Sequence, residues 1–175
     1  MLVIDTGVRH AHATGGYAER RAACERGAAA LGIPALRDAS EEDLVRLADL
    51  FDATTLRRVR HVVTENARVL ETVRTLRAEC PAAIGDLLLA SHASMRDDFD
   101  ISTPELDAAV DASVTAGALG ARMTGGGFGG AAIALVPREL APAVTDAVAS
   151  AFADAGFAAP TVFPVAPSAG ASRDA

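Results

Sequence analysis

The sequence predicts an α+β fold in which helices cover one face of a small antiparallel sheet. One observation is the order of the elements, in which a few short apolar runs typical of strands are set among much longer helical patterns. A second is a glycine-rich segment that lies directly between two of those runs. A third is the length of 175 residues, half of them hydrophobic, which suits one domain with a core of its own.

The first elements follow from apolar runs and helix signals. Residues 2–4 are a short apolar run that predicts a buried strand. The Gly–Gly pair at residues 15–16 is expected to break the chain, and a helix follows over residues 17–31. Ser40 is of the residue type that caps helices, and it predicts a short helix that runs to Leu50.

The clearest helix covers residues 55–77, where one face is almost wholly apolar. That face carries Leu56, Val59, Val62, Val63, Asn66, Val69, Leu70, Val73 and Leu76. The opposite stripe carries His61, Glu65, Arg68 and Thr72. His61 and Glu65 have a spacing that could hold a metal, but no second pair of ligands accompanies them. We therefore favour a solvated or interhelical polar stripe and predict no metal site.

The second half of the chain predicts helices around two strands and a last strand. Ser102 and Glu105 have the spacing of a capping box, which places Ser102 at the N-cap of a helix. The expected elements are a helix from about Pro81 to Met95, a helix from Ser102 to Gly117, strands at 118–123 and 131–136, a helix at 142–155 and a strand at 161–165.

Charge and composition exclude several classes of protein. A net charge of −7 argues against nucleic acid as a partner, because such binding proteins are usually basic. The 16 basic residues include no Lys, so a Walker A phosphate loop is excluded. Cys24 and Cys80 do not have the spacing of a zinc site or a disulfide framework. The first apolar run is too short for a signal sequence, and no stretch approaches a membrane span, so we expect a cytoplasmic protein with no membrane partner.

The glycine loop, residues 125–130, is the strongest local signal. Five of the 15 glycines fall within its six positions. A tight turn needs one or two glycines, so the excess favours a loop whose backbone N–H groups lie close to an anionic ligand. Its spacing is neither G-x-G-x-x-G nor Walker A.

Other polar residues leave alternatives open. Arg9 and His10 follow the first strand, where an Arg could neutralise a phosphate or simply lie on the surface. Tyr17, the only Tyr, could pack on the core or bond a polar ligand through its hydroxyl. The polar cluster at residues 91–98 contains Ser, His and Asp and invites comparison with a hydrolase triad, but no G-x-S-x-G elbow accompanies it, so we do not predict one.

Several motifs together resemble one family. The string GARMTGGGFGG over residues 120–130 resembles a motif of the galactokinases, in the superfamily named for galactokinase, homoserine, mevalonate and phosphomevalonate kinases (GHMP kinases). Further matching strings are VRH at residues 8–10 with the following Tyr17, Arg20, Arg21 and Cys24, then RHVVTEN at 60–66, SHASMRDDF at 91–99, STPELD at 102–107 and PSAGA at 167–171. The resemblance thus runs from residue 1 to about residue 171, as one domain with a frayed tail at 172–175.

The resemblance implies a fold, a reaction and a division of labour. The fold would be the ferredoxin-like C-terminal domain of GHMP kinases. The reaction would be phosphorylation of the C1 hydroxyl of galactose by ATP with Mg²⁺, in which positioning and charge stabilisation dominate. The sugar segment, the Gly/Ser-rich ATP loop and the catalytic base belong to an N-terminal domain that these residues do not match. We therefore expect the 175-residue chain to be inactive by itself.

The resemblance also implies roles for particular residues. Tyr17 matches a Tyr that contacts galactose, and Arg9 matches an Arg close to the active site. Gly125, Gly126 and Gly127 match the loop near the transferred phosphate. Residues 2–4 and the glycine loop would leave an apolar patch exposed, which predicts self-association or poor solubility. The alternatives are a non-catalytic remnant, a sugar-sensing protein, or a related kinase with another substrate.

Overall fold

The structure, a computed structural model, describes residues 1–9 and 13–170. Its single described sheet has the strand order β2-β3-β1-β4, and every neighbouring pair is antiparallel. The strands are β1 (Leu2–Asp5), β2 (Gly120–Thr124), β3 (Ala131–Leu135) and β4 (Thr161–Pro164). This is the ferredoxin-like order, and the predicted α+β class is confirmed. His10 and the predicted frayed tail at residues 172–175 lie outside the described residues.

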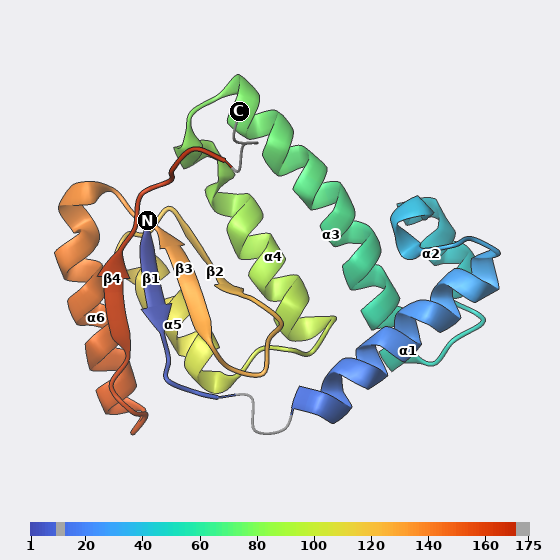
Figure 1. Cartoon of the computed structure of the whole chain (residues 1–175), viewed down its shortest axis with the longest axis horizontal. Coiled ribbons are helices and arrows are strands. Elements are labelled where there is room, and N and C mark those ends of the chain that lie inside the picture. Colours follow the sequence, from blue (N-terminus) through green and yellow to red (C-terminus); the bar gives the residue numbers. More distant parts are fainter. Residues whose placement is uncertain (10–12, 171–175) are drawn as a thin grey trace, which may run out of the picture.

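The helices fall into two groups (Figure 1). Two of them, α5 and α6, cover one face of the sheet, and α4 packs along β2. The other three, α1, α2 and α3, extend to the side of the sheet. The bounds are α1 Ala13–Leu31, α2 Glu41–Leu47, α3 Ala53–Ala78, α4 Gly85–Asp97, α5 Pro104–Thr115 and α6 Ala141–Asp154, with short 3₁₀ turns at Leu36–Asp38, Pro81–Ile84 and Arg138–Leu140.

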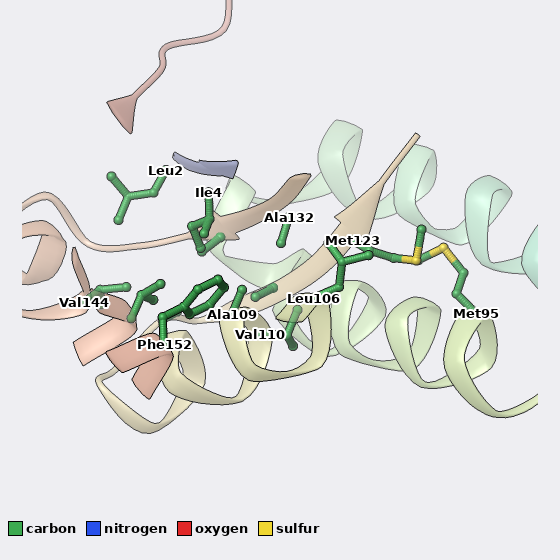
Figure 2. Packing of buried hydrophobic residues seen from close by; sticks show 14 of the residues in the cluster. Leu2, Ile4, Met95, Leu106, Ala109, Val110, Met123, Ala132, Val144 and Phe152 are labelled. Carbon is green, nitrogen blue, oxygen red and sulfur yellow. The ribbon is translucent and has the colours of Figure 1, made fainter. Parts of the chain in front are cut away.

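The main core lies between the sheet and its two covering helices (Figure 2). Alternate strand residues point the same way, and the register pairs Leu2 with Ala134 and Ile4 with Ala132 on this face. The alanines of β3 leave room for larger helix residues. Those residues, all fully buried, are Leu106 of α5 and Val144, Val148 and Phe152 of α6.

The first strand is not an exposed edge. β1 pairs with β3 on one side and β4 on the other, and Leu2 and Ile4 are buried beneath the helices. The expectation of an exposed apolar patch at residues 2–4 is therefore wrong. Among the described residues, the exposed large apolar side chains in or beside these strands are Met1, Leu119, Phe163 and Val165.

A smaller core joins α1, α2 and α3, which we call the helical arm. Its buried residues are Ala28, Leu36, Leu47, Val59 and Val63. Gly27 allows α1 to approach α3 closely, since a Cβ there would lie 2.7 Å from a methyl group of Val59. The second half of α3 leaves this core, and its apolar residues Val69, Leu70, Val73 and Leu76 are exposed. The predicted apolar face of α3 is thus buried only in its first half.

Several predicted helix bounds differ from the structure, among them the start of the helix expected at Pro81, where a 3₁₀ turn precedes α4, and two of the differences have a clear structural cause. α1 begins at Ala13 and runs through Gly15 and Gly16, which do not break the chain. Gly16 is required by a tertiary contact, because a Cβ there would lie 2.5 Å from the ring of Phe128. The N-cap of α5 is Thr103, whose side chain accepts the Leu106 N–H, while the predicted cap, Ser102, donates to Asp107 instead.

Candidate active site at the glycine loop

The glycine loop connects β2 to β3 and is held by two other segments. At the end of β1, Thr6 N–H donates to the Gly130 carbonyl at 3.0 Å, and Gly130 N–H donates to the Val8 carbonyl at 2.9 Å. On the other side, Phe128 N–H donates to the Ile101 carbonyl at 2.7 Å. Phe128 holds this position with a φ of 61°, in the left-handed region that non-glycine residues seldom adopt. The loop is therefore anchored by its neighbours.

Tyr17, on the first turns of α1, lies against this loop. Its hydroxyl is so close to Gly126 that a Cβ at that position would overlap it. Its ring meets Phe128 edge-on, with centroids 5.5 Å apart. The side chain is 43% exposed, and its hydroxyl has no hydrogen-bond partner among the described residues. The hydroxyl can therefore bond a ligand that lies at the loop.

The three glycines that the sequence singled out have different surroundings. Gly126 and Gly127 are required by the protein itself, because a Cβ would meet Tyr17 at the first and the Ile101 carbonyl, 2.5 Å away, at the second. Gly125 is exposed, has a φ of 84°, and has no atom within 4 Å of where its Cβ would be. Packing thus explains part of the glycine excess, and Gly125 is where a ligand has room to approach the backbone.

Arg9 is exposed and comes directly after Val8, the residue that bonds Gly130. The backbone thereby places Arg9 beside the glycine loop. His10, its partner in the sequence motif, is outside the described residues.

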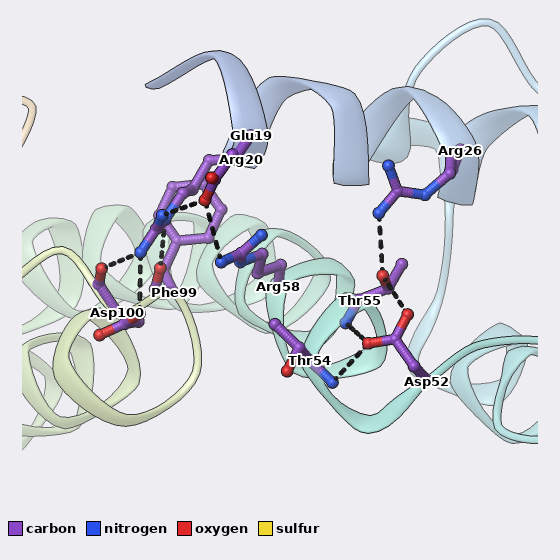
Figure 3. A network of polar contacts seen from close by, with 9 residues as sticks. All are labelled: Glu19, Arg20, Arg26, Asp52, Thr54, Thr55, Arg58, Phe99 and Asp100. Carbon is purple, nitrogen blue, oxygen red and sulfur yellow. Dashed lines mark hydrogen bonds and ion pairs between the residues drawn. The ribbon is translucent and has the colours of Figure 1, made fainter. Parts of the chain in front are cut away.

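Arg20 is the residue of this region that residue-by-residue reasoning missed (Figure 3). It is only 7% exposed, and its guanidinium lies 5.1 Å from the centroid of the Phe128 ring. Nε donates to the Phe99 carbonyl at 3.1 Å, and Nη2 donates to both the carbonyl and the carboxylate of Asp100. A signal was present in the sequence, since Arg20 follows Tyr17 by three positions and so shares its helix face.

The Ser91–Asp98 cluster does not form a catalytic triad. Ser91 donates to Glu65 at 2.5 Å, whereas His92 Nδ1 accepts the Met123 N–H at 3.2 Å. His92 Nε2 lies 3.2 Å from an Asp107 carboxylate oxygen but is out of line for a hydrogen bond. Burial lowers the pKa of His92, which favours the neutral ring that this Nδ1 contact requires.

The polar stripe of α3 faces α4, as predicted. His61 Nδ1 and Ser94 Oγ are 2.9 Å apart, and the His61 ring stacks on Phe99 with centroids 4.4 Å apart. Glu65 receives hydrogen bonds from Ser91 and, at 3.3 Å, from Arg122 of β2. Burial also lowers the pKa of His61. These contacts join the helical arm to the sheet.

Residues 1–9 and 13–170 contain neither a membrane-spanning helix nor a cluster of metal-ligand side chains. No helix in that part of the chain is long and apolar enough to cross a bilayer. In the same residues, no three His, Cys, Asp or Glu side chains gather as a metal site requires.

Comparisons with known proteins consistently give kinases. Residues 72–154 match the family model described as GHMP kinases C terminal. Galactokinase of Streptomyces coelicolor is 56% identical over 99% of this chain and 45% of that protein. Galactokinase of Mycobacterium tuberculosis is 51% identical over 93% of this chain and 45% of that protein. The chain therefore spans about 45% of the length of these curated relatives.

Solved structures agree with the sequence relatives. Galactokinase of Lactococcus lactis complexed with galactose matches with a TM-score of 0.84 and 36% identity, over 93% of this chain and 43% of that one. Mevalonate kinase of L. major in complex with R-mevalonate matches with a TM-score of 0.51 and 23% identity, over 87% of this chain and 37% of that one. The second match shows a likeness of fold alone.

Proposed function

This chain corresponds in sequence and fold to the C-terminal portion of the galactokinases of the GHMP kinase superfamily, and we propose that it supplies part of a galactokinase active site. The proposed reaction transfers the γ-phosphoryl group of ATP to the C1 hydroxyl of galactose. The observation that carries the proposal is that the hydroxyl of the exposed residue Tyr17 lies against Gly126, next to the open space at Gly125.

Each residue of the site has a proposed role. The Tyr17 hydroxyl bonds a hydroxyl of galactose, which orients the sugar. The backbone N–H groups of Gly125, Gly126 and Gly127 face the phosphate that is being transferred, where fixed dipoles stabilise negative charge without rearranging. Arg9 neutralises part of the phosphate charge. The base that receives the C1 proton is expected in the part of the relatives that this chain does not span.

ATP and Mg²⁺ are proposed from the family and fit this chain unequally. The glycine loop offers backbone donors, which suit phosphate oxygens. Mg²⁺ prefers carboxylate and phosphate oxygens, and the described residues bring no three such ligand side chains together. We therefore assign no step of the reaction to the metal through residues of this chain.

A chimera tests the proposal directly. The segment of Streptomyces coelicolor galactokinase that this chain matches is replaced by this chain, and galactose-dependent ADP release is measured. The chimera is expected to phosphorylate galactose in preference to glucose and mevalonate, whereas the 175-residue chain by itself is expected to show no turnover. A folded chimera without activity would favour the non-catalytic or sugar-sensing alternative, and a preference for mevalonate would favour a related kinase.

The substitution Tyr17→Phe tests the sugar contact. Loss of one hydrogen bond is expected to raise the KM of the chimera for galactose by about two- to tenfold, with a smaller change in KM for ATP. Arg21→Ala is the matched control, because the Arg21 side chain is 82% exposed and pairs with Glu25. An unchanged KM for galactose would remove Tyr17 from the sugar site.

A further inference from the structure

We propose that Arg20 is a positioning residue of this site, which holds the start of α1, and with it Tyr17, against the glycine loop. The consequence of this positioning for the reaction rests on the proposed function. The coupling between Arg20 and Tyr17 rests on geometry, because Arg20 belongs to α1 and contacts Phe99, Asp100 and Phe128 at once.

Arg20 bonds the turn after α4 through two of its three guanidinium nitrogens. Its Nε and Nη2 bond the carbonyls of Phe99 and Asp100, and Nη2 also meets the Asp100 carboxylate at 2.9 Å. Nη1 meets Glu19 at 3.2 Å. A buried guanidinium requires such partners. The protein thus occupies four of the five N–H donors of the guanidinium, and these contacts make Arg20 a residue that fixes the turn.

The turn after α4 in turn anchors the glycine loop. Asp100 has a φ of 57°, and the next residue, Ile101, accepts the Phe128 N–H at 2.7 Å. The position of the Ile101 carbonyl therefore sets the position of Phe128. By holding the two carbonyls that precede Ile101, Arg20 acts on the loop through the backbone.

Arg20 also contacts the glycine loop directly. The guanidinium lies 5.1 Å from the centroid of the Phe128 ring, within the range of a cation–π interaction. The same ring meets Tyr17 edge-on and contacts Gly16, so three positions of α1 surround it. Loss of Arg20 would free one side of Phe128 and loosen the surface against which Tyr17 packs.

The test exploits the composition of the chain. Tyr17 is the only Tyr and the chain has no Trp, so tyrosine fluorescence and the tyrosine band of near-ultraviolet circular dichroism report on Tyr17 above a phenylalanine background. Arg20→Ala is expected to weaken that band and to speed amide hydrogen exchange in the glycine loop by about tenfold. Arg21→Ala, one position along the same helix, is expected to change neither.

Two milder variants cover the case in which Arg20→Ala does not fold. Arg20→Lys keeps the charge but cannot bond two carbonyls in the same way, and it is expected to restore the tyrosine band only in part. Asp100→Asn keeps a residue that tolerates a positive φ and removes one partner of Arg20, so a smaller loss of the band is expected. Folding is checked by far-ultraviolet circular dichroism.

A double-mutant cycle in the chimera separates positioning from general stability. Arg20→Ala is expected to raise the KM for galactose about tenfold, and clearly less in a Tyr17→Phe background, because the two residues act on one contact. Additive effects, or equal tyrosine bands and exchange rates in Arg20→Ala and Arg21→Ala, would overturn the proposal. If the parent chimera is inactive, the proposed function fails, while the spectroscopic result still decides whether Arg20 positions Tyr17.

Discussion

The sheet region, formed by the four strands with α5 and α6, and the helical arm are stabilised by different means. Among the described residues, the cluster at the sheet buries fifteen apolar side chains, whereas the cluster of the arm buries five. The arm adds polar contacts. Asp52 caps α3 by accepting the Thr54 and Thr55 N–H groups, and Arg26 of α1 bonds Thr55 at 2.9 Å (Figure 3).

The difference matters because the candidate site combines both regions. The glycine loop belongs to the sheet region, whereas Tyr17 belongs to α1 of the arm. Elements with few buried apolar contacts open more readily than a well-packed core. We therefore expect Tyr17 to leave the loop in local openings of the arm that do not disturb the sheet.

The largest expected effect comes from emptying one core at a time. Phe152→Ala in the sheet region is expected to cost about 3–5 kcal/mol, because it leaves a cavity in a fully buried layer. Leu47→Ala in the arm is expected to cost about 2–3 kcal/mol, felt mainly by the arm. Urea unfolding measures the total loss, and hydrogen exchange assigns it to segments.

The pattern of exchange decides whether the two regions differ. Phe152→Ala is expected to lower protection throughout the described chain, whereas Leu47→Ala is expected to lower it in α1, α2 and α3 alone. If Leu47→Ala exposes the strand amides to the same extent, the arm and the sheet unfold as one unit.

Acid is expected to have a smaller effect on stability, through two buried histidines on neighbouring helices between the arm and the sheet. Burial lowers the pKa of both His61 on α3 and His92 on α4, so the unfolded chain, with histidine pKa values of about 6.5, takes up these protons first. The stability that these two neutral histidines contribute is therefore fully present above about pH 7. It is lost as the pH drops below about 6.5, and the free energy of unfolding falls by up to about 1.4 kcal/mol per pH unit for each histidine.

Asparagine variants test the source of this pH dependence. His61→Asn and His92→Asn keep a polar group near Nδ1 but do not titrate, so the double variant is expected to have a flatter plot of unfolding free energy against pH between 7.5 and 5.5. Nearby charged groups remain in all variants, namely Glu65, Arg68, Asp98 and Arg122 around His61, and Arg96, Asp107 and Asp111 around His92. An unchanged slope would show that acid acts elsewhere.

The fold was predictable because its signals are local. Each strand coincides with an apolar run, α3 follows a periodic apolar pattern, and a capping Ser or an early Pro marks the starts of α2, α5 and α6. The errors arose where distant contacts decide the outcome. Gly16 stays helical because Phe128 packs on it, and the second half of α3 has an apolar face that the described residues do not cover.

The site was predictable only in part. The glycine loop is conspicuous in composition, and resemblance to a family drew attention to Tyr17 and Arg9, whose roles stay predictions. The positioning contacts of Arg20 were not accessible, because Phe99 and Asp100 are 79 and 80 positions away in the chain. Sequence patterns report the face of a helix but not the partner that meets it.

The smallest expected effect on stability concerns the exposed stripe of α3. Leu70 is 60% exposed, and Val69, Val73 and Leu76 beside it are exposed too, so this stripe, rather than residues 2–4, is a surface at which the predicted self-association can be tested. Leu70→Gln is expected to change the free energy of unfolding by less than about 0.5 kcal/mol, since it removes few buried contacts.

The same substitution separates this stripe from the open face of the sheet, where Phe163 is 43% exposed. Light scattering across a concentration series measures the mass of the wild-type chain, Leu70→Gln and Phe163→Gln. If the arm carries the self-association, Leu70→Gln lowers the mass and Phe163→Gln does not, whereas the reverse result assigns it to the sheet. A wild-type chain that stays monomeric at all concentrations would show that neither surface binds a second copy. The arm would then differ from the sheet in stability alone.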